Sequence, residues 1–329
     1  MIVMFMDFQK RNISFTDLIL NYFSYFKLRL NIFKKIPTFL VYRRLYRNYF
    51  TVYKSVSWKR YPIEAIMRNG DPVVLRNSLE AQMYDGRHKG YECDITNDIV
   101  TLSALNSDRK KINLTIYGGT SNGDIKGIFV DNIYQHLPVK NKNVIDIGAN
   151  IGDSAIYFAI NGATKVISLE PFPKNYELAE KNIKLNNFSD HVTLLLAGCS
   201  GNRNEITIDP DFISGNSTIL KEFKIGIKVP LMTLEDILKG ISHSDNSIIL
   251  KMDCEGCEYE TIISANENTL QRFSHIMIEY HFGYKNLKEK LEKNGFKVSI
   301  TRPHIYWYSP DELQGNTKFV EGYIIAERR

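Results

Sequence analysis

From about residue 137 onward, short apolar runs alternate with longer amphipathic segments. This alternation is typical of the strands and helices that build a parallel sheet. The expected strands are 143–147, 165–169, 192–196, 247–252 and 275–280. The expected helices are 154–161, 174–186, 257–266 and 285–294. The pattern therefore predicts an α/β fold with an open, mostly parallel sheet.

The regular repeat is interrupted between the third and fourth expected strands. Residues 205–208, 217–220 and 226–230 have the composition of added strands or of loops over the carboxyl end of the sheet. The chain then closes with two more strand-like runs, 295–301 and 321–326. A hairpin of these two runs would give the sheet an antiparallel edge strand, a known variation of this fold.

Residues 1–60 interleave aromatic and basic side chains at spacings compatible with helices. Such an arm could contact a membrane surface or a partner, but its aromatics could equally be the core of a helical cap, which we prefer. From 61 to 135, turn signals such as Asn69-Gly70 separate short apolar runs and predict a small β-rich lead-in. The main domain is expected to take 136–329.

Charge is distributed unevenly along the 329 residues, although the net charge is only +5. Residues 1–62 carry twelve Lys/Arg against Asp7 and Asp17, and the remainder carries 30 Lys/Arg against 35 Asp/Glu. A basic arm on a mildly acidic body suits an anionic partner, so a peripheral membrane contact through residues 1–60 is conceivable, whereas nucleic acid is disfavoured by the acidic body.

The sequence offers no sign of membrane insertion or export. It contains no uncharged apolar run of the roughly 18 residues that a span requires, and the start MIVMFMDFQK lacks the basic lead-in of a secretory signal. We therefore expect a cytoplasmic protein, with a peripheral position at the inner membrane surface as the alternative that the basic arm allows.

The strongest chemical signal is the segment Val144–Ser154, in which an apolar strand runs into a glycine-containing turn and then a helix. Glycines allow a ligand to approach the backbone closely, and the helix start offers free N–H groups. This is the pattern of a nucleotide-type cofactor turn. The candidate cofactor-binding residues are Asp146, Gly148, Ala149, Asn150, Gly152, Asp153 and Glu170.

Two acids indicate which cofactor. Asp146, at the end of the first strand, would repel a pyrophosphate but suits the ammonium of S-adenosylmethionine. Glu170 ends the second strand, where a carboxylate can accept hydrogen bonds from two ribose hydroxyls. Gly148 and Gly152 lack the G-x-G-x-x-G spacing of NAD sites, so S-adenosylmethionine is favoured over NAD.

A second signal, Leu250–Glu258, lies at the end of the fourth strand, where open α/β sheets hold their ligands. Together, Asp146–Gly152, Glu170–Pro173 and Lys251–Glu258 resemble the FkbM family of S-adenosylmethionine-dependent methyltransferases. The resemblance covers about residues 137–285. It implies a class I, Rossmann-like methyltransferase fold and O-methylation of hydroxyls on sugars, polyketides or related metabolites.

A hydroxyl acceptor must lose its proton, and Asp253 is the first candidate for the base or the acceptor-orienting group, with Glu255 and His281 as further catalytic candidates. Asp253, Glu255 and Glu279 could together offer oxygen ligands to Mg²⁺. We favour a site without metal, because Lys251 could neutralise these carboxylates.

Cys254 and Cys257 stand where the family usually has small apolar residues, so we expect structural packing rather than a redox or zinc site. The four cysteines are too few and too scattered for a disulfide framework. Two alternatives to a metabolite O-methyltransferase stay open: an RNA methyltransferase that uses the basic arm, and a non-catalytic cofactor-binding, membrane-docking protein.

Overall fold

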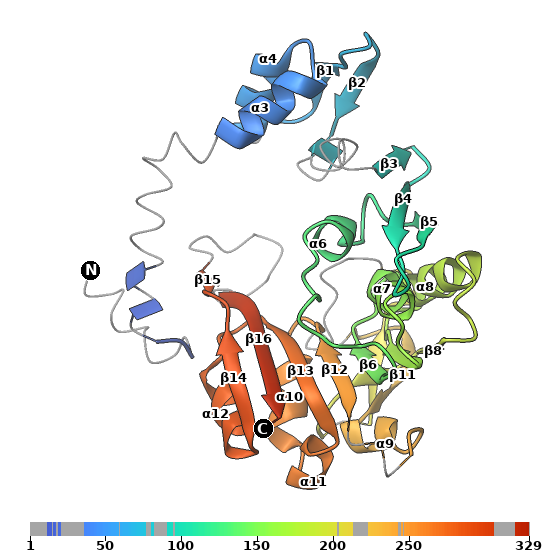
Figure 1. Ribbon diagram of the computed structural model, residues 1–329, viewed down its shortest axis with the longest axis vertical. Helices are drawn as coiled ribbons and strands as arrows, with labels where there is room; N and C mark the ends of the chain where they lie inside the picture. Colours follow the sequence, from blue (N-terminus) through green and yellow to red (C-terminus); the bar gives the residue numbers. More distant parts are fainter. Residues whose placement is uncertain are drawn as a thin grey trace.

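A computed structural model shows an α/β domain built on one large sheet (Figure 1). The structure describes residues 12–14, 16–17, 19–20, 36–58, 60–76, 80–81, 91–94, 96–202, 204–212, 223–242, 245, 247–305 and 320–328.

The main sheet has the order β14-β16-β13-β12-β6-β7-β8. Its five parallel strands are β6 (Asn143–Ile147), β7 (Lys165–Leu169), β8 (Val192–Leu195), β12 (Ile248–Met252) and β13 (Phe273–Tyr280). The closing hairpin consists of β14 (Phe296–Ile300) and β16 (Val320–Arg328), and β16 runs antiparallel to both β14 and β13. A short β15 (His304–Ile305) pairs with β16. The order and directions of these strands confirm the predicted α/β fold with an antiparallel edge.

The helices follow the strands as the sequence predicted, within about two residues at each end. The four expected helices are α7 (Asp153–Ile160), α8 (Pro173–Leu185), α10 (Cys257–Ser264) and α12 (Lys285–Lys293). The structure adds the short helices α6 (Ile125–Phe129), α9 (Leu234–Leu238) and α11 (Glu267–Leu270). The strands are buried on both faces because neighbouring residues enter different cores: Ile145 packs with α9, α10 and α12, and Val144 packs with α7 and α8. Near-continuous apolar strands are what such a doubly covered sheet requires.

The interruption between β8 and β12 forms a smaller sheet. β10 (Glu205–Ile208) and β11 (Ile227–Met232) pair as an antiparallel hairpin, and β11 pairs in parallel with β9 (Gly198–Cys199). The buried side chains of this sheet join the main core. Two of the three added strands expected here are thus confirmed, and the third, 217–220, lies outside the described residues.

Residues 36–75 form a small unit with its own core, drawn in blue to teal in Figure 1. It comprises α3 (Ile36–Leu45), α4 (Tyr49–Ser57), β1 (Ile63–Ile66) and β2 (Pro72–Leu75). Tyr42 and Tyr46 are buried in its core together with residues of β1 and β2, so residues on both sides of position 60 share one core. The aromatic cluster 22–26 of the arm lies outside the described residues.

A three-stranded sheet lies between this unit and the α/β domain (Figure 1). It consists of β3 (Tyr91–Asp94), β4 (Ile99–Leu105) and β5 (Lys111–Tyr117). The Asn182 side chain of α8 accepts a hydrogen bond from the Tyr117 N–H (2.8 Å) and donates one to the Tyr117 carbonyl (2.9 Å). The edge of β5 is therefore held on the α/β domain. In the part of the chain that the structure describes, no helix has the length and apolar character that a membrane crossing requires.

A buried ion pair joins the two central strands. Lys251 on β12 and Asp146 on β6 are register partners, and Lys251 Nζ lies 3.1 Å from Asp146 Oδ1. Both side chains are almost fully shielded from solvent. Ser154 and Ser168 donate to Asp146 Oδ2, and Lys251 Nζ donates to the Gly148 carbonyl at 2.7 Å. Burial alone lowers the pKa of Lys251, but Asp146 and Asp253 outweigh it and raise that pKa, so the ammonium stays charged.

Replacing Lys251 by Met leaves the Asp146 carboxylate buried beside its two serines without its cation. We expect the free energy of unfolding, measured by urea denaturation, to fall by about 3–5 kcal/mol, the usual cost of stranding one buried charge. The double variant Lys251→Met/Asp146→Asn should recover part of this loss. Lys165→Met, at an exposed position of the neighbouring strand, should change stability by no more than about 0.5 kcal/mol. If the losses in the free energy of unfolding simply add in the double variant, Lys251 and Asp146 are not coupled.

Candidate functional site

The candidate site lies where the sheet changes its direction of growth. From β6 the chain adds β7 and β8 on one side, and it then returns to place β12 on the other side of β6. The loops that follow β6 and β12 must diverge at this point, and the crevice between them is where open α/β sheets bind ligands. The loops of interest are 148–152 after β6, 170–172 after β7 and 253–256 after β12.

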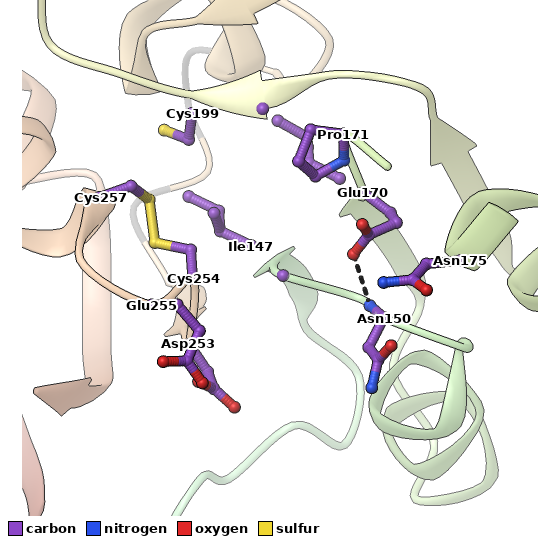
Figure 2. A pocket seen from close by; sticks show the side chains of 13 residues that line it. Ile147, Asn150, Glu170, Pro171, Asn175, Cys199, Asp253, Cys254, Glu255 and Cys257 are labelled. Atoms are coloured by element: carbon purple, nitrogen blue, oxygen red, sulfur yellow. Dashed lines mark hydrogen bonds between the residues drawn. A yellow bond between two sulfur atoms is a disulfide. The ribbon is translucent and has the colours of Figure 1, made fainter. Parts of the chain in front are cut away.

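A cleft with about 530 Å³ of empty space, including the part open to solvent, occupies this crevice (Figure 2). The residues that line it are Ile147, Gly148, Asn150, Leu169, Glu170, Pro171, Asn175, Gly198, Cys199, Asp253, Cys254, Glu255 and Cys257. Figure 2 shows Glu170, Asn150 and Asn175 on one side, and Asp253 and Glu255 on the other.

Gly148 allows the loops after β6 and β12 to touch. Its φ is +83°, and a Cβ built on it would lie 1.8 Å from the Asp253 carbonyl oxygen. The Asp253 N–H also donates to the Ile147 carbonyl at 3.0 Å. A glycine is therefore required here both by conformation and by space, and its backbone forms one wall of the cleft.

Glu170 and Asn150 form the polar side of the cleft. The buried Glu170 carboxylate accepts hydrogen bonds from the backbone N–H of Asn150 (2.8 Å) and of Phe172 (3.0 Å). Burial raises the pKa of Glu170 to about 7, against the lowering effect of these bonds, of Asn175 and of Lys251. The Asn150 side chain donates to the Asn122 carbonyl, whereas its Oδ1 is shielded from solvent without a hydrogen-bond partner. An acceptor left open in this way can receive a ligand's N–H or O–H group.

Asp146 does not occupy the position that the sequence led us to expect. It is fully buried, it does not line the cleft, and its charge is balanced by Lys251. The prediction that it meets a ligand's ammonium is therefore not supported, because pairing with the neighbouring strand uses the charge. Lys251, expected to neutralise the carboxylates after the fourth strand, turns inward for the same reason.

The other residues of the predicted cofactor turn do not line the cleft, and they support the conformation of the loop after β6. Ala149 is buried, and Gly152 is the N-cap of α7, where its φ of +84° places it against the backbone of Ala179. The buried Asp153 carboxylate accepts from the N–H groups of Asp124 and Ser154, and burial raises its pKa to about 7. Of the seven predicted cofactor residues, Gly148, Asn150 and Glu170 line the cleft.

A disulfide links Cys254 and Cys257 in the loop after β12, as the yellow bond in Figure 2 shows. We expected structural packing of the two cysteines rather than a redox or zinc site, and the bond between them shows that this expectation is wrong. The turn through Glu255 (φ +56°) and Gly256 (φ +120°) brings the two Cα atoms to 5.6 Å, within the bonding range. Cys199 is a free, buried thiol, and burial raises its pKa to about 12.

The acidic side of the cleft surrounds His281, which directly follows β13. The buried imidazole places Nε2 3.4 Å from Glu255 Oε2 and 3.9 Å from Asp253 Oδ1, and Nδ1 3.3 Å from Glu258 Oε1. The structure thus brings the three predicted catalytic residues together. Burial lowers the pKa of His281, but the surrounding carboxylates outweigh it and raise that pKa well above its usual value. Burial likewise raises the pKa of Glu255 to about 7.

Sequence reasoning missed Glu258, Asn175 and Asn122. Glu258, in the first turn of α10, is fully buried and accepts from the N–H groups of Cys254 (2.9 Å) and Gly256 (2.8 Å). It therefore holds the loop after β12 as well as His281. The Asn122 side chain, which lies in a loop far from α8 in sequence, donates to the side-chain oxygen Oδ1 of Asn175 at 2.9 Å. Of these three residues, only Glu258 had a local sequence signal. It lies three residues after Glu255, in the first turn of an expected helix.

Comparison with known proteins finds similarity to methyltransferases. Residues 146–298 match the family model described as the Methyltransferase FkbM domain. A protein named Methyltransferase 1 from Beauveria bassiana is 23% identical over 214 residues, covering 56% of this chain and 84% of that protein. Methyltransferase sdnD from Sordaria araneosa is 27% identical over 229 residues, covering 57% and 85%. Among solved structures, a methyltransferase FkbM from Methylobacillus flagellatus aligns with a TM-score of 0.39 and 15% identity, covering 62% of this chain and 48% of that one.

Reducing the Cys254–Cys257 disulfide should destabilise the chain, because the bond closes a four-residue loop and restricts the unfolded state. In the chain-entropy description a loop of this size is worth about 2 kcal/mol. We expect dithiothreitol to lower the free energy of unfolding in urea by this amount. The variant Cys254→Ala/Cys257→Ala should be insensitive to dithiothreitol, which controls for effects on Cys199. An unchanged unfolding curve for the unmodified chain would contradict the prediction.

Proposed function

Residues 146–298 of this chain belong to the FkbM family of methyltransferases, and from this premise we propose that the methyl donor is S-adenosylmethionine and that the acceptor is a hydroxyl of a sugar, a glycan or a related metabolite. The observation that carries the proposal is the pair formed by Glu170 and the glycine turn at Gly148, which line the same cleft. A buried carboxylate at the end of the second strand suits ribose hydroxyls.

The residues of the cleft fit this donor. Glu170 would accept from the ribose hydroxyls, and the backbone around Gly148 leaves room for the donor to pass close to the chain. Asn150 Oδ1, shielded and without a partner, would accept from the donor's ammonium or another N–H group. Asp146 contributes indirectly, by holding Lys251 and through it the Gly148 carbonyl. When bound, S-adenosylmethionine supplies an electrophilic methyl group.

The opposite wall of the cleft suits a hydroxyl acceptor. Asp253 and Glu255 present carboxylate oxygens from the loop after β12, beside His281. Carboxylates accept hydrogen bonds from hydroxyl groups, so they can orient a sugar oxygen and receive its proton as it is methylated. Holding the acceptor in line with the methyl group can account for much of the rate enhancement in a displacement of this kind. The proposed catalytic residues are therefore Asp253, Glu255 and His281.

Glu170→Gln should weaken the binding of S-adenosylhomocysteine, measured by calorimetric titration. A hydrogen bond to a charged group is worth about 1.5–3 kcal/mol, so the dissociation constant should rise about tenfold or more. The matched control is Glu180→Gln, which removes a carboxylate from the exposed face of α8, the helix that follows Glu170. NAD should bind neither protein. Preference for NAD, or binding unaffected by Glu170→Gln, would refute the proposed donor site.

The same titration should depend on pH in a defined direction. The ribose hydroxyls need the ionised carboxylate, whereas a pKa of about 7 keeps most of Glu170 protonated at pH 6. Because only the ionised fraction is competent, affinity should rise about tenfold from pH 6 to pH 8. Glu170→Gln should abolish this rise, while Glu255→Gln, on the other wall, should retain it.

With donor carrying a labelled methyl group, the protein should methylate polyhydroxylated acceptors and form ethers that resist mild base. A panel of free sugars, amino sugars and RNA separates the acceptor classes. Asp253→Asn should lower the rate by about a hundredfold, in the usual range for a lost proton acceptor, while leaving the binding of S-adenosylhomocysteine intact. Label that enters only RNA, or only amine groups, would overturn the assignment of hydroxyl acceptors.

A further inference from the structure

The side chains of Asp253, Glu255 and His281 converge from two different elements of the fold. One ligand atom from each of the three lies within 4.8 Å of the other two. His281 Nε2 is 3.4 Å from Glu255 Oε2 and 3.9 Å from Asp253 Oδ1. The two distances from His281 are shorter than twice a metal–ligand bond to nitrogen or oxygen, which is about 2.0–2.2 Å long, so one ion can bridge His281 and each carboxylate.

Glu258 supplies a second, independent feature of a metal site. It lies 3.3 Å from His281 Nδ1, on the side of the ring away from the cluster. Its two oxygens are held by the N–H groups of Cys254 and Gly256, and the side chain is fully buried. Ligating histidines usually give their second nitrogen to a carboxylate in this way, which sets the ring orientation and leaves the other nitrogen aimed at the ion.

The balance of charge also favours a cation. Four carboxylates, those of Asp253, Glu255, Glu258 and Glu279, act on one another or on His281. Lys251, the cation that the sequence suggested for neutralising them, forms its ion pair with Asp146 and also interacts electrostatically with Asp253. Carboxylates gathered in a partly buried cleft repel one another, and a divalent ion offsets this repulsion more fully than one imidazolium.

We propose that Asp253, Glu255 and His281 bind a divalent transition-metal ion on the acceptor side of the cleft. One imidazole and two carboxylates suit Mn²⁺, Fe²⁺ or Zn²⁺ better than Mg²⁺, which prefers an all-oxygen set. Glu279, which we had considered as a ligand from the sequence, is not in the group, and His281 takes its place. Three protein ligands leave positions for water or for an acceptor hydroxyl, whose pKa such an ion lowers.

The binding of the ion follows from the geometry alone, whereas its use in catalysis rests on the proposed function. The two are separable by experiment. The metal is tested without donor or acceptor, and S-adenosylhomocysteine binding at Glu170 is measured in metal-free protein. Failure of one measurement therefore leaves the other standing.

The test is a titration of the full-length, chelator-treated protein with Mn²⁺, followed by electron paramagnetic resonance. Free Mn²⁺ gives a six-line signal that is lost on binding. We expect one ion per chain and an affinity at least tenfold weaker in Asp253→Asn, Glu255→Gln and His281→Gln. Glu279→Gln is the matched control, because it removes a carboxylate that interacts with Asp253 and His281 but lies outside the ligand group. The affinity of this variant should change less than threefold.

A second readout identifies the ligand directly. Electron spin echo modulation from ¹⁴N should accompany bound Mn²⁺ in the unmodified protein and be absent in His281→Gln. Asp253 is partly exposed, so Asp253→Asn should fold even where a substitution of the buried His281 does not. The proposal is overturned by absence of binding at millimolar Mn²⁺, or by binding that Asp253→Asn leaves unchanged. Equal weakening by Glu279→Gln would indicate general electrostatic attraction and would also overturn it.

Discussion

The ion pair between Asp146 and Lys251 is the interaction on which the rest of the site depends. It joins the two strands at which the sheet changes direction, so both charges lie in the interior just below the diverging loops. An ammonium in this position also holds the Gly148 carbonyl. The Lys251 ammonium on β12 therefore holds the loop after β6. This contact fixes the position of that loop relative to the loop after β12. Removing either charge would strand the other in a medium of low dielectric, which explains why a pair is found here rather than a single polar side chain.

The two loops of the cleft concentrate unusual backbone conformations. Gly148 and Gly152 in one loop, and Glu255 and Gly256 in the other, all have positive φ. Glu255 adopts this conformation as a residue with a side chain, which costs free energy and is found where surrounding contacts over-determine the backbone. Those contacts are present: Glu258 receives two N–H groups of the loop, and a disulfide spans the same turn. The loop can thus present Asp253 and Glu255 in a set orientation, which a site for either a hydroxyl or an ion requires.

Much of this arrangement could be predicted from the sequence, because it is encoded locally. Strand and helix positions follow from hydrophobic period and glycine placement, and Glu170 could be assigned from its place after the second strand. What could not be predicted depends on partners far away in the chain. The sequence around Asp146 predicts a ligand-binding acid. Its charge is instead balanced by Lys251, which lies more than a hundred residues later in the chain. The same holds for Glu258, whose role appears only once His281 is beside it. Pairing across strands determines which acids face the cleft, and a local sequence pattern carries no information about that pairing.

The pairing of β6 with β12 joins Val144 to Ile249, so about a hundred residues separate two strands that touch in the middle of the sheet. Closing a loop of this size costs chain entropy before its contacts compensate, and folding slows as such distant pairings dominate. β6, β7 and β8 are sequential neighbours and can associate early, whereas the crevice exists only after β12 has docked beside β6. The cleft is accordingly expected to be among the last features to form as the chain folds. A nascent chain that ends before Met252 lacks the loop after β12, so one wall of the cleft is missing and no binding site can form.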